Sequence, residues 1–185
     1  MPENILPYKG TLPTIGAGVF LAPTATVIGD VEIGDGSNIW FGCLVRGDIN
    51  VIRIGNRVNI QDLTVIHVDS ITYGTFIGDD VTIGHSAIVH ACTLEPGSFV
   101  GMQACVMDGA VVETGAMVAA GALVPPGKVV KAGQLWAGTP ARFVRECGDQ
   151  ENEMIERVPP EYWEMAQEYL KTGVGVVGKE AEGKE

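Results

Sequence analysis

The sequence predicts an all-β solenoid, a parallel β-helix of six-residue repeats, followed by a C-terminal α-helix. Three observations predict it. Aliphatic residues recur every six positions over most of the chain. The 185 residues include 25 glycines but only 6% aromatic residues, a composition that suits short stacked strands better than a mixed globular core. The periodicity stops after residue 142, and a stretch with helical spacing follows.

The repeat indicates a coil with three sides. A period of six is neither the 3.6 of an amphipathic helix nor the simple alternation of an ordinary strand. Each hexad is expected to form one side of a triangular prism, with its aliphatic residue inward and glycine-bearing corners. About twenty hexads give six to seven coils stacked roughly 4.8 Å apart. The expected inward residues are Ile15, Leu21, Val27, Ile33, Ile39, Val45, Val51, Ile54, Ile60, Ile66, Ile77, Ile83, Val89, Leu94, Val100, Val106, Val112, Val118, Val124 and Val130.

Two interruptions break the phase of the repeat. Three extra residues fall in the segment VIRIG at 51–55, and an eleven-residue step separates Ile66 from Ile77. Loops on a rigid solenoid commonly mark its working face. We therefore expect functional side chains near these two places.

The segment VPPEYWEMAQEYLKTG, which follows the repeats, predicts a helix. Pro160 suits its first turn, and Gly173 ends it. Tyr162, Ala166 and Tyr169 share one face at helical spacing. We expect this face to pack against the prism or a neighbouring subunit.

Composition and charge limit the organisation and the partners of the chain. We expect a β-helix domain at 1–145, a helical segment at 146–172 and a disordered tail at 173–185. A net charge of −11 argues against nucleic acid and against an anionic membrane surface as partners. The N-terminal residues do not resemble a signal peptide, and no apolar run is long enough to span a membrane. The expected location is cytoplasmic.

The three histidines of the chain, His67, His85 and His90, all lie in outward phase. His67 and His90 follow an inward aliphatic residue by one position, and His85 follows one by two. Stacking brings residues about eighteen apart within one coil spacing of each other. Three imidazoles are the ligand set of a catalytic zinc site that keeps its fourth position for water. The alternative is three unrelated surface histidines.

Polar neighbours strengthen the metal hypothesis. Arg46 and Gln61 occupy the same outward phase as His67. Arg46 and Asp48 could form an ion pair, and Gln61 and Asp62 offer groups that orient ligands or a bound hydroxide. Taken singly, each is an ordinary surface residue.

Taken together, these motifs are similar to those of a known family. Over residues 10 to about 172 the chain resembles the γ-class carbonic anhydrases, and its hexad signature resembles that of left-handed β-helix proteins. The motifs that carry the resemblance are RGD at 46–48, NIQDLTVIH at 59–67, GHSAIVH at 84–90, VGMQACVMDGA at 100–110 and WAGTPAR at 136–142.

The resemblance implies a homotrimer with one metal site at each subunit interface. It implies that His67 and His90 come from one chain and His85 from its neighbour. Arg46 and Asp48 correspond to an interface ion pair of the family. The implied metal is Zn²⁺, although three imidazoles and a water also bind Fe²⁺ or Co²⁺.

The resemblance also implies the substrate and the surrounding residues. The reaction is the reversible hydration of CO2 to bicarbonate, in which a metal-bound hydroxide attacks CO2. Gln61 matches the residue that holds this hydroxide, with Asn59 and Asp62 nearby. Tyr162 matches a tyrosine that lines the pocket.

The sequence departs from the best-known active members of that family, which carry two glutamates for proton export. Ile49 stands where one glutamate follows RGD, and the interval from His67 to His85 is too short for the acidic loop that carries the other. The chain therefore resembles the shorter subclass, whose members vary in activity. Asp69 and Tyr73 in the remaining loop could relay a proton, or the loop is a plain surface loop.

Two further function classes fit the same prism. Hexapeptide acyltransferases use a histidine as general base and bind an acyl-CoA between subunits. A structural or assembly subunit would keep the fold, and with it the metal, but catalyse little. Turnover of acetyl-CoA would indicate the first class, and a stable metallated trimer without CO2 hydration would indicate the second.

Overall fold

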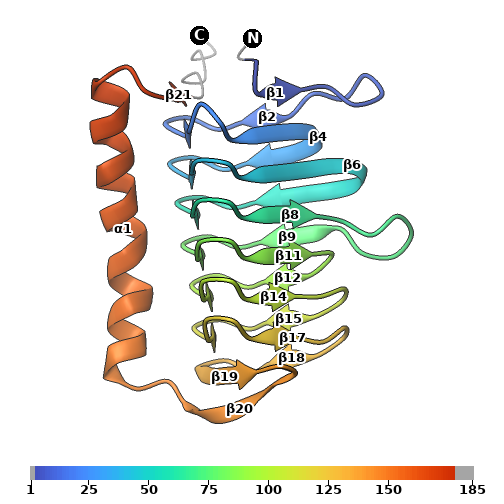
Figure 1. Cartoon of the computed structure of the whole chain (residues 1–185), viewed down its shortest axis with the longest axis vertical. Helices are drawn as coiled ribbons and strands as arrows, with labels where there is room; N and C mark the ends of the chain where they lie inside the picture. The colour runs from blue at the N-terminus through green and yellow to red at the C-terminus, as the bar shows by residue number, and fades with distance from the viewer. Residues whose placement is uncertain (1–2, 178–185) are drawn as a thin grey trace, which may run out of the picture.

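The computed structural model describes residues 3–177 and contains the predicted all-β solenoid. The chain winds into a triangular left-handed prism of parallel strands, and α1 (Asp149–Lys171) returns along its side (Figure 1). Seven stacked parallel strands of the described part form one face, which gives one strand per coil. No helix in the described part of the chain is long and apolar enough to cross a membrane.

Short strands form three faces of the prism. The first face consists of β8 (Val65–His67), β11 (Ile88–His90), β14 (Cys105–Val106) and β17 (Leu123–Val124). The second face consists of β9 (Thr75–Ile77), β12 (Thr93–Leu94), β15 (Val111–Val112) and β18 (Val129–Val130). The third face consists of β3 (Phe20–Leu21), β5 (Asn38–Ile39), β7 (Asn59–Ile60), β10 (Thr82–Ile83), β13 (Phe99–Val100), β16 (Met117–Val118) and β19 (Gln134–Gly138).

Long strands at the N-terminal end join the first and second faces into one sheet. These strands are β4 (Thr26–Ile33) and β6 (Leu44–Ile54), and the short β1 (Ile5–Leu6) and β2 (Thr14–Ile15) pair with β4. At the other end, β20 (Ala141–Glu146) runs antiparallel to β19 and closes the prism.

The aliphatic residues of successive coils stack in register inside the prism. On the first face Val45, Ile66, Val89 and Val106 form one such column, and each is fully buried. Each buried aliphatic side chain contributes about 1.5–3 kcal/mol of stabilisation. The period of six therefore builds a continuous core, as the sequence predicts.

The first interruption lies slightly before its predicted place. β6 pairs Gly47 with Gly29 and Ile52 with Val31, so the three extra residues fall between Gly47 and Ile52. Ile52 is fully buried, whereas Val51 is partly exposed. The prediction that Val51 points inward was wrong, because the run VIRI offers aliphatic residues in both phases.

The helix begins well before the predicted first turn at Pro160. α1 starts at Asp149, where the Glu151 carboxylate accepts the N–H of Gly148 at 2.9 Å and pairs with Arg145. Acidic residues in a first turn also favour a helix start. Pro159 and Pro160 lie inside the helix, where each removes one backbone donor.

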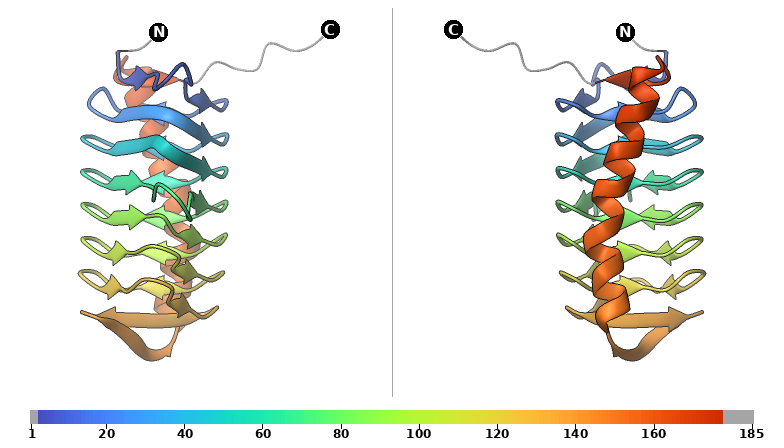
Figure 2. Two further views of the ribbon diagram at one scale, coloured as in Figure 1. Left: turned by 90° about the vertical axis from the view of Figure 1, so that its right-hand side faces the viewer. Right: turned by 90° about the vertical axis from the view of Figure 1, so that its left-hand side faces the viewer.

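The helix packs on the third face through the predicted residues (Figure 2). Ala166 is fully buried, and the ring of Trp40 makes edge contacts with Tyr162 and Tyr169 at centroid distances of 5.3 and 5.6 Å. Disorder was expected from residue 173 onward. Val176–Val177 form β21, which pairs with β3, and 178–185 lie outside the described residues.

Candidate metal centre

Two of the three histidines lie side by side at the edge between the first and second faces. β8 and β11 are in register with His67 opposite His90. Nδ1 of His67 is 3.3 Å from Nε2 of His90. The side chains are 15% and 31% exposed, so both rings are accessible from one side. We refer to this place as the paired-histidine edge.

A carboxylate contacts the outer nitrogen of each of these rings. Oδ1 of Asp48 lies 3.0 Å from Nε2 of His67, and Oδ1 of Asp108 lies 2.6 Å from Nδ1 of His90. Asp48 also pairs with Arg46 within the same chain. Burial raises the pKa of Asp48, but hydrogen bonds from His67 and Arg46 together outweigh it and lower the pKa below its usual value.

The third histidine lies at the opposite edge of the first face. His85 occupies the turn between β10 and β11, which separates the third face from the first. Its Nδ1 is 2.9 Å from Oδ2 of Asp62, and its Nε2 is 3.4 Å from the hydroxyl of Tyr162. Its side chain is 36% exposed. We refer to this place as the single-histidine edge.

Tyr162 reaches this edge from α1. Its ring makes an edge contact with the ring of Trp40. Burial raises the pKa of its hydroxyl, and the nearby carboxylates of Asp62 and Glu161 raise it further. The tyrosine therefore stays protonated and can donate to the lone pair of His85.

Gln61 and Asn59 lie on the third face, on β7 or directly after it. Gln61 is 5% exposed and lines a hollow of about 290 Å³ together with Tyr162, Phe99 and Met117. Asn59 is fully buried, and its amide has no hydrogen-bond partner among residues 3–177. Gln61, Asp62 and Tyr162 thus gather near His85, whereas Asn59 lies deeper.

One chain does not assemble all three imidazoles. Within residues 3–177, no group of three His, Cys, Asp or Glu side chains is placed to hold a metal ion. The width of the first face explains this, because His85 precedes β11 and His90 ends it. Within one chain, His85 and the paired-histidine edge therefore lie on opposite sides of the first face.

The donor atoms present fit a tetrahedral metal ion. Zinc binds imidazole nitrogen at about 2.0–2.1 Å, so two ligands of a tetrahedral ion lie about 3.3–3.4 Å apart. The nitrogens of His67 and His90 have this separation. Asp48 on His67 and Asp62 on His85 are the kind of carboxylate contact that histidine ligands commonly make.

Among residues 3–177, none of the four cysteines hydrogen-bonds to a histidine side chain. Burial raises the pKa of all four thiols, to about 12 for Cys43. A thiol with a raised pKa holds little thiolate, which is the form that binds metal or attacks substrate. All four cysteines are free.

The loop 68–74, visible in Figure 1 between β8 and β9, holds Asp69 in a tight turn. Its carboxylate accepts the N–H groups of Thr72 at 2.9 Å and Ile71 at 3.2 Å, which lower its pKa. A proton relay works best with a pKa near the working pH. The structure therefore favours a turn-forming role for Asp69.

Asp108 is the residue near the histidines that sequence reasoning missed. It lies eighteen residues after His90, one more than the seventeen-residue coil that pairs Val89 with Val106. That spacing, combined with the outward phase of both positions, was the available signal.

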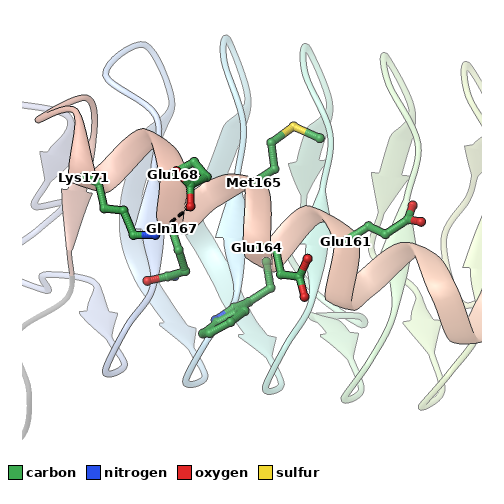
Figure 3. Close-up of a pocket in the computed structure, with 7 residues that line it drawn as sticks. Glu161, Glu164, Met165, Gln167, Glu168 and Lys171 are labelled. Atoms are coloured by element: carbon green, nitrogen blue, oxygen red, sulfur yellow. Dashed lines mark hydrogen bonds and ion pairs between the residues drawn. The ribbon is translucent and has the colours of Figure 1, made fainter.

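A larger hollow runs along the outer side of α1 (Figure 3), with a volume of about 770 Å³. Its lining includes an ion pair between Glu168 and Lys171 at 2.6 Å. None of the histidines or their carboxylate partners lines it, so it is separate from the candidate metal centre.

Comparison with known proteins gives consistent results. The family model described as bacterial transferase hexapeptide (six repeats) matches residues 13–47. A carbonic anhydrase of Geobacillus kaustophilus is 45% identical over 165 residues, which cover 89% of this chain and 90% of that protein. Gamma carbonic anhydrase 2, mitochondrial, of Arabidopsis thaliana is 48% identical over 160 residues, which cover 84% of this chain and 58% of that longer protein.

Solved structures share the fold closely. A putative acetyltransferase of Bacillus cereus superposes with a TM-score of 0.88 at 38% identity, covering 91% of this chain and 97% of that one. A hexapeptide transferase family protein of Anaplasma phagocytophilum superposes with a TM-score of 0.87 at 46% identity, covering 91% and 99%.

Proposed function

Because the chain belongs to the γ-class carbonic anhydrase family, we propose that it catalyses the reversible hydration of CO2 to bicarbonate at a metal ion. The observation that carries the proposal is the pair of imidazole nitrogens of His67 and His90, which face each other at 3.3 Å. His85 of a neighbouring subunit would supply the third imidazole. Three protein ligands leave the fourth position of the metal for water.

A homotrimer would bring the two edges together. Between them the first face carries an apolar column in which Val65 is 37% and Ile88 is 46% exposed. Leu44, Cys105 and Leu123 continue the column in register. Apolar surface of this kind is suited to burial against other copies, and a head-to-tail contact closes into a ring when its rotation permits.

The proposed metal is Zn²⁺, and Fe²⁺ or Co²⁺ would accept the same three imidazoles. Such an ion supplies a hydroxide nucleophile near neutral pH, because it lowers the pKa of water to about 7. Metal analysis of the protein as isolated would identify the physiological metal.

In this proposal, the residues of this chain orient the histidine rings and the reactants and keep bulk water out of the site. Asp48 and Asp62 accept the N–H of His67 and His85 and thereby fix which nitrogen of each ring is free to bind. Gln61 lines the hollow together with Gly84, the residue before His85, and its amide is a group that can hydrogen-bond an oxygen of the reactants. Tyr162 borders the same hollow, and the apolar lining excludes bulk water from it.

Asn59 and the Arg46–Asp48 pair receive structural roles in this proposal. Asn59 is fully buried beneath α1, so we propose that it acts through the position of β7 rather than by contact with substrate. Arg46 and Asp48 pair within one chain here, and we propose that the pair also borders the subunit interface. The expected cytoplasmic location stays a prediction, since the plant relatives are named as mitochondrial.

Stopped-flow CO2 hydration tests the proposal directly. Zinc-loaded and anaerobic iron-loaded samples of quantified metal content are compared, each beside the His85→Ala variant. We expect a rate well above buffer that the variant loses. No rate in either metallated form would contradict the proposal.

Acetyl transfer is the second candidate, because similar solved structures are named as a putative acetyltransferase and a hexapeptide transferase. It would use His85 as a general base beside the hollow that Gln61 and Tyr162 line. Turnover of acetyl-CoA by metal-free protein would favour it.

A structural or assembly role is the third candidate. Ile49 stands 45% exposed at the position where active relatives of the best-known kind carry a proton-exporting glutamate. A metallated trimer that hydrates no CO2 and transfers no acetyl group would indicate this role.

A further inference from the structure

We propose that Asp108 is a positioning residue for the metal centre, and that the loop 68–74 braces it. This inference rests on the proposed function. It concerns a side chain that lies one coil beyond His90 and contacts its Nδ1 through Oδ1 at 2.6 Å.

The contact sets the tautomer of His90. A carboxylate can only accept, so Nδ1 of His90 carries the proton and Nε2 keeps its lone pair. Nε2 is the atom that faces Nδ1 of His67 at 3.3 Å. Asp108 therefore aims the binding lone pair of His90 at the place where both rings converge.

The backbone around Asp108 is fixed from both neighbouring coils. The N–H of Gly109 donates to the carbonyl of Ala91 at 2.7 Å, and the N–H of Gly127 donates to the carbonyl of Asp108 at 2.9 Å. These bonds tie the turn of Asp108 to the coil of His90 on one side and to the next coil on the other. The carboxylate is thus preorganised before any ligand binds.

The loop 68–74 packs against the turn that contains Asp108. Tyr73 lies against Gly109, whose φ of +66° is a left-handed conformation, and a Cβ on that glycine would lie 3.0 Å from Cζ of the tyrosine ring. The ring thus covers the turn next to Asp108. This contact gives the loop a bracing role that does not require a proton-carrying side chain.

The Asp108 carboxylate has no other ion-pair partner in the described part of the chain that would account for its position. Within the described part of the chain, the sole ion-pair partner of Asp108 is His90, whereas Asp48 also pairs with Arg46. Asp108 is 33% exposed on its side chain, so it could have been hydrated instead. The contact between its Oδ1 and Nδ1 of His90 therefore serves to hold the imidazole of His90 in place.

Cobalt affinity tests this proposal without reference to activity. The wild type, Asp108→Ala and Asp108→Asn are titrated with Co²⁺ against a chelator, and the visible spectrum of the bound cobalt reports its coordination. Asp80→Asn is the matched control, because Asp80 pairs with Arg57 away from the histidines. Melting of the metal-free proteins checks that each variant is folded.

We expect Asp108→Ala to weaken cobalt binding about 10–100-fold and to alter the spectrum. Asp108→Asn should lose less, because its amide oxygen still accepts the N–H of His90, and Asp80→Asn should match the wild type. Equal affinity and an equal spectrum in Asp108→Ala and the wild type would overturn the inference while leaving the proposed function intact. A wild type that binds no metal would overturn the proposed function itself, and this inference with it.

Discussion

The two edges of the first face carry different parts of the candidate metal centre. The paired-histidine edge has two imidazoles in contact with carboxylates, and none of the described helix covers it. The single-histidine edge has one imidazole, but α1 adds Tyr162, and Gln61 borders an apolar hollow there. The paired-histidine edge thus carries two candidate ligands, and the single-histidine edge carries one candidate ligand together with residues that would surround the metal. In the proposed site, the solenoid separates complementary halves by the width of one face, and a second copy would complete them.

The largest expected effect comes from removing one imidazole from either edge. His85→Ala and His90→Ala should each abolish stoichiometric metal binding, although the two residues lie at opposite edges. Both side chains point out of the core, so the metal-free variants should melt like the wild type. Metal analysis after dialysis makes the measurement. One metal ion per chain in either variant would show that its histidine is not a ligand.

Loss of Trp40 should disturb the two edges unequally. Its ring is 3% exposed and touches Tyr162 and Tyr169 of α1, so Trp40→Ala should cost about 3–5 kcal/mol of the free energy of unfolding. Hydrogen exchange should increase in α1 and near His85, and stay unchanged in β8 and β11. Denaturant titration measures the first effect. Equal exchange at both edges would mean that the edges are not independent.

Tyr162→Phe should have a smaller effect. The variant keeps the ring on Trp40 and removes the hydroxyl that lies 3.4 Å from Nε2 of His85. A long hydrogen bond of this kind contributes about 0.5 kcal/mol or less, at the low end of the usual range. Stability should therefore hardly change in thermal melting. A loss comparable to that of Trp40→Ala would show that the hydroxyl, not the ring, holds the helix.

The smallest effect is expected far from both edges, at the start of α1. Hydrogen bonds from Arg145 and from the N–H of Gly148 lower the pKa of Glu151 to about 2. A lowered pKa stabilises the fold above the ordinary value of 4.5 and loses that contribution as the pH falls toward 2. Glu151→Gln should therefore melt slightly lower than the wild type at pH 7, and the difference should narrow as the pH falls from 4.5 toward 2. A difference that stays constant over this range would contradict the assignment.

Much of the site follows from the period of six. Because the inward aliphatic residues fix the phase, the outward positions of His67, His85 and His90 could be predicted, and Gln61 and Asp62 do lie near one of them, His85. The phase alone does not place each histidine at a corner of the prism, so it cannot show that His85 and the other two lie at opposite edges. The proposed partition between two chains is what the family resemblance implies.

The features that were missed share a physical cause. The role of Asp108 depends on stacking across one coil; it lies in the motif at 100–110, but that motif alone does not show that its side chain reaches His90. The burial of Ile52 in place of Val51 depends on where β6 accommodates extra residues, because both side chains suit the core. The early start of α1 depends on contacts of Glu151 that outweigh the proline signal at Pro160.

Mixing two inactive variants tests most directly whether the site is shared between chains. His85→Ala retains the paired-histidine edge, and His90→Ala retains the single-histidine edge. After unfolding and refolding together, each mixed trimer should contain one interface that joins an intact paired-histidine edge to an intact single-histidine edge, because the contact is head-to-tail. Metal analysis of the mixed sample should therefore show bound metal where each variant alone shows none. Mixed trimers that bind no metal would contradict the account.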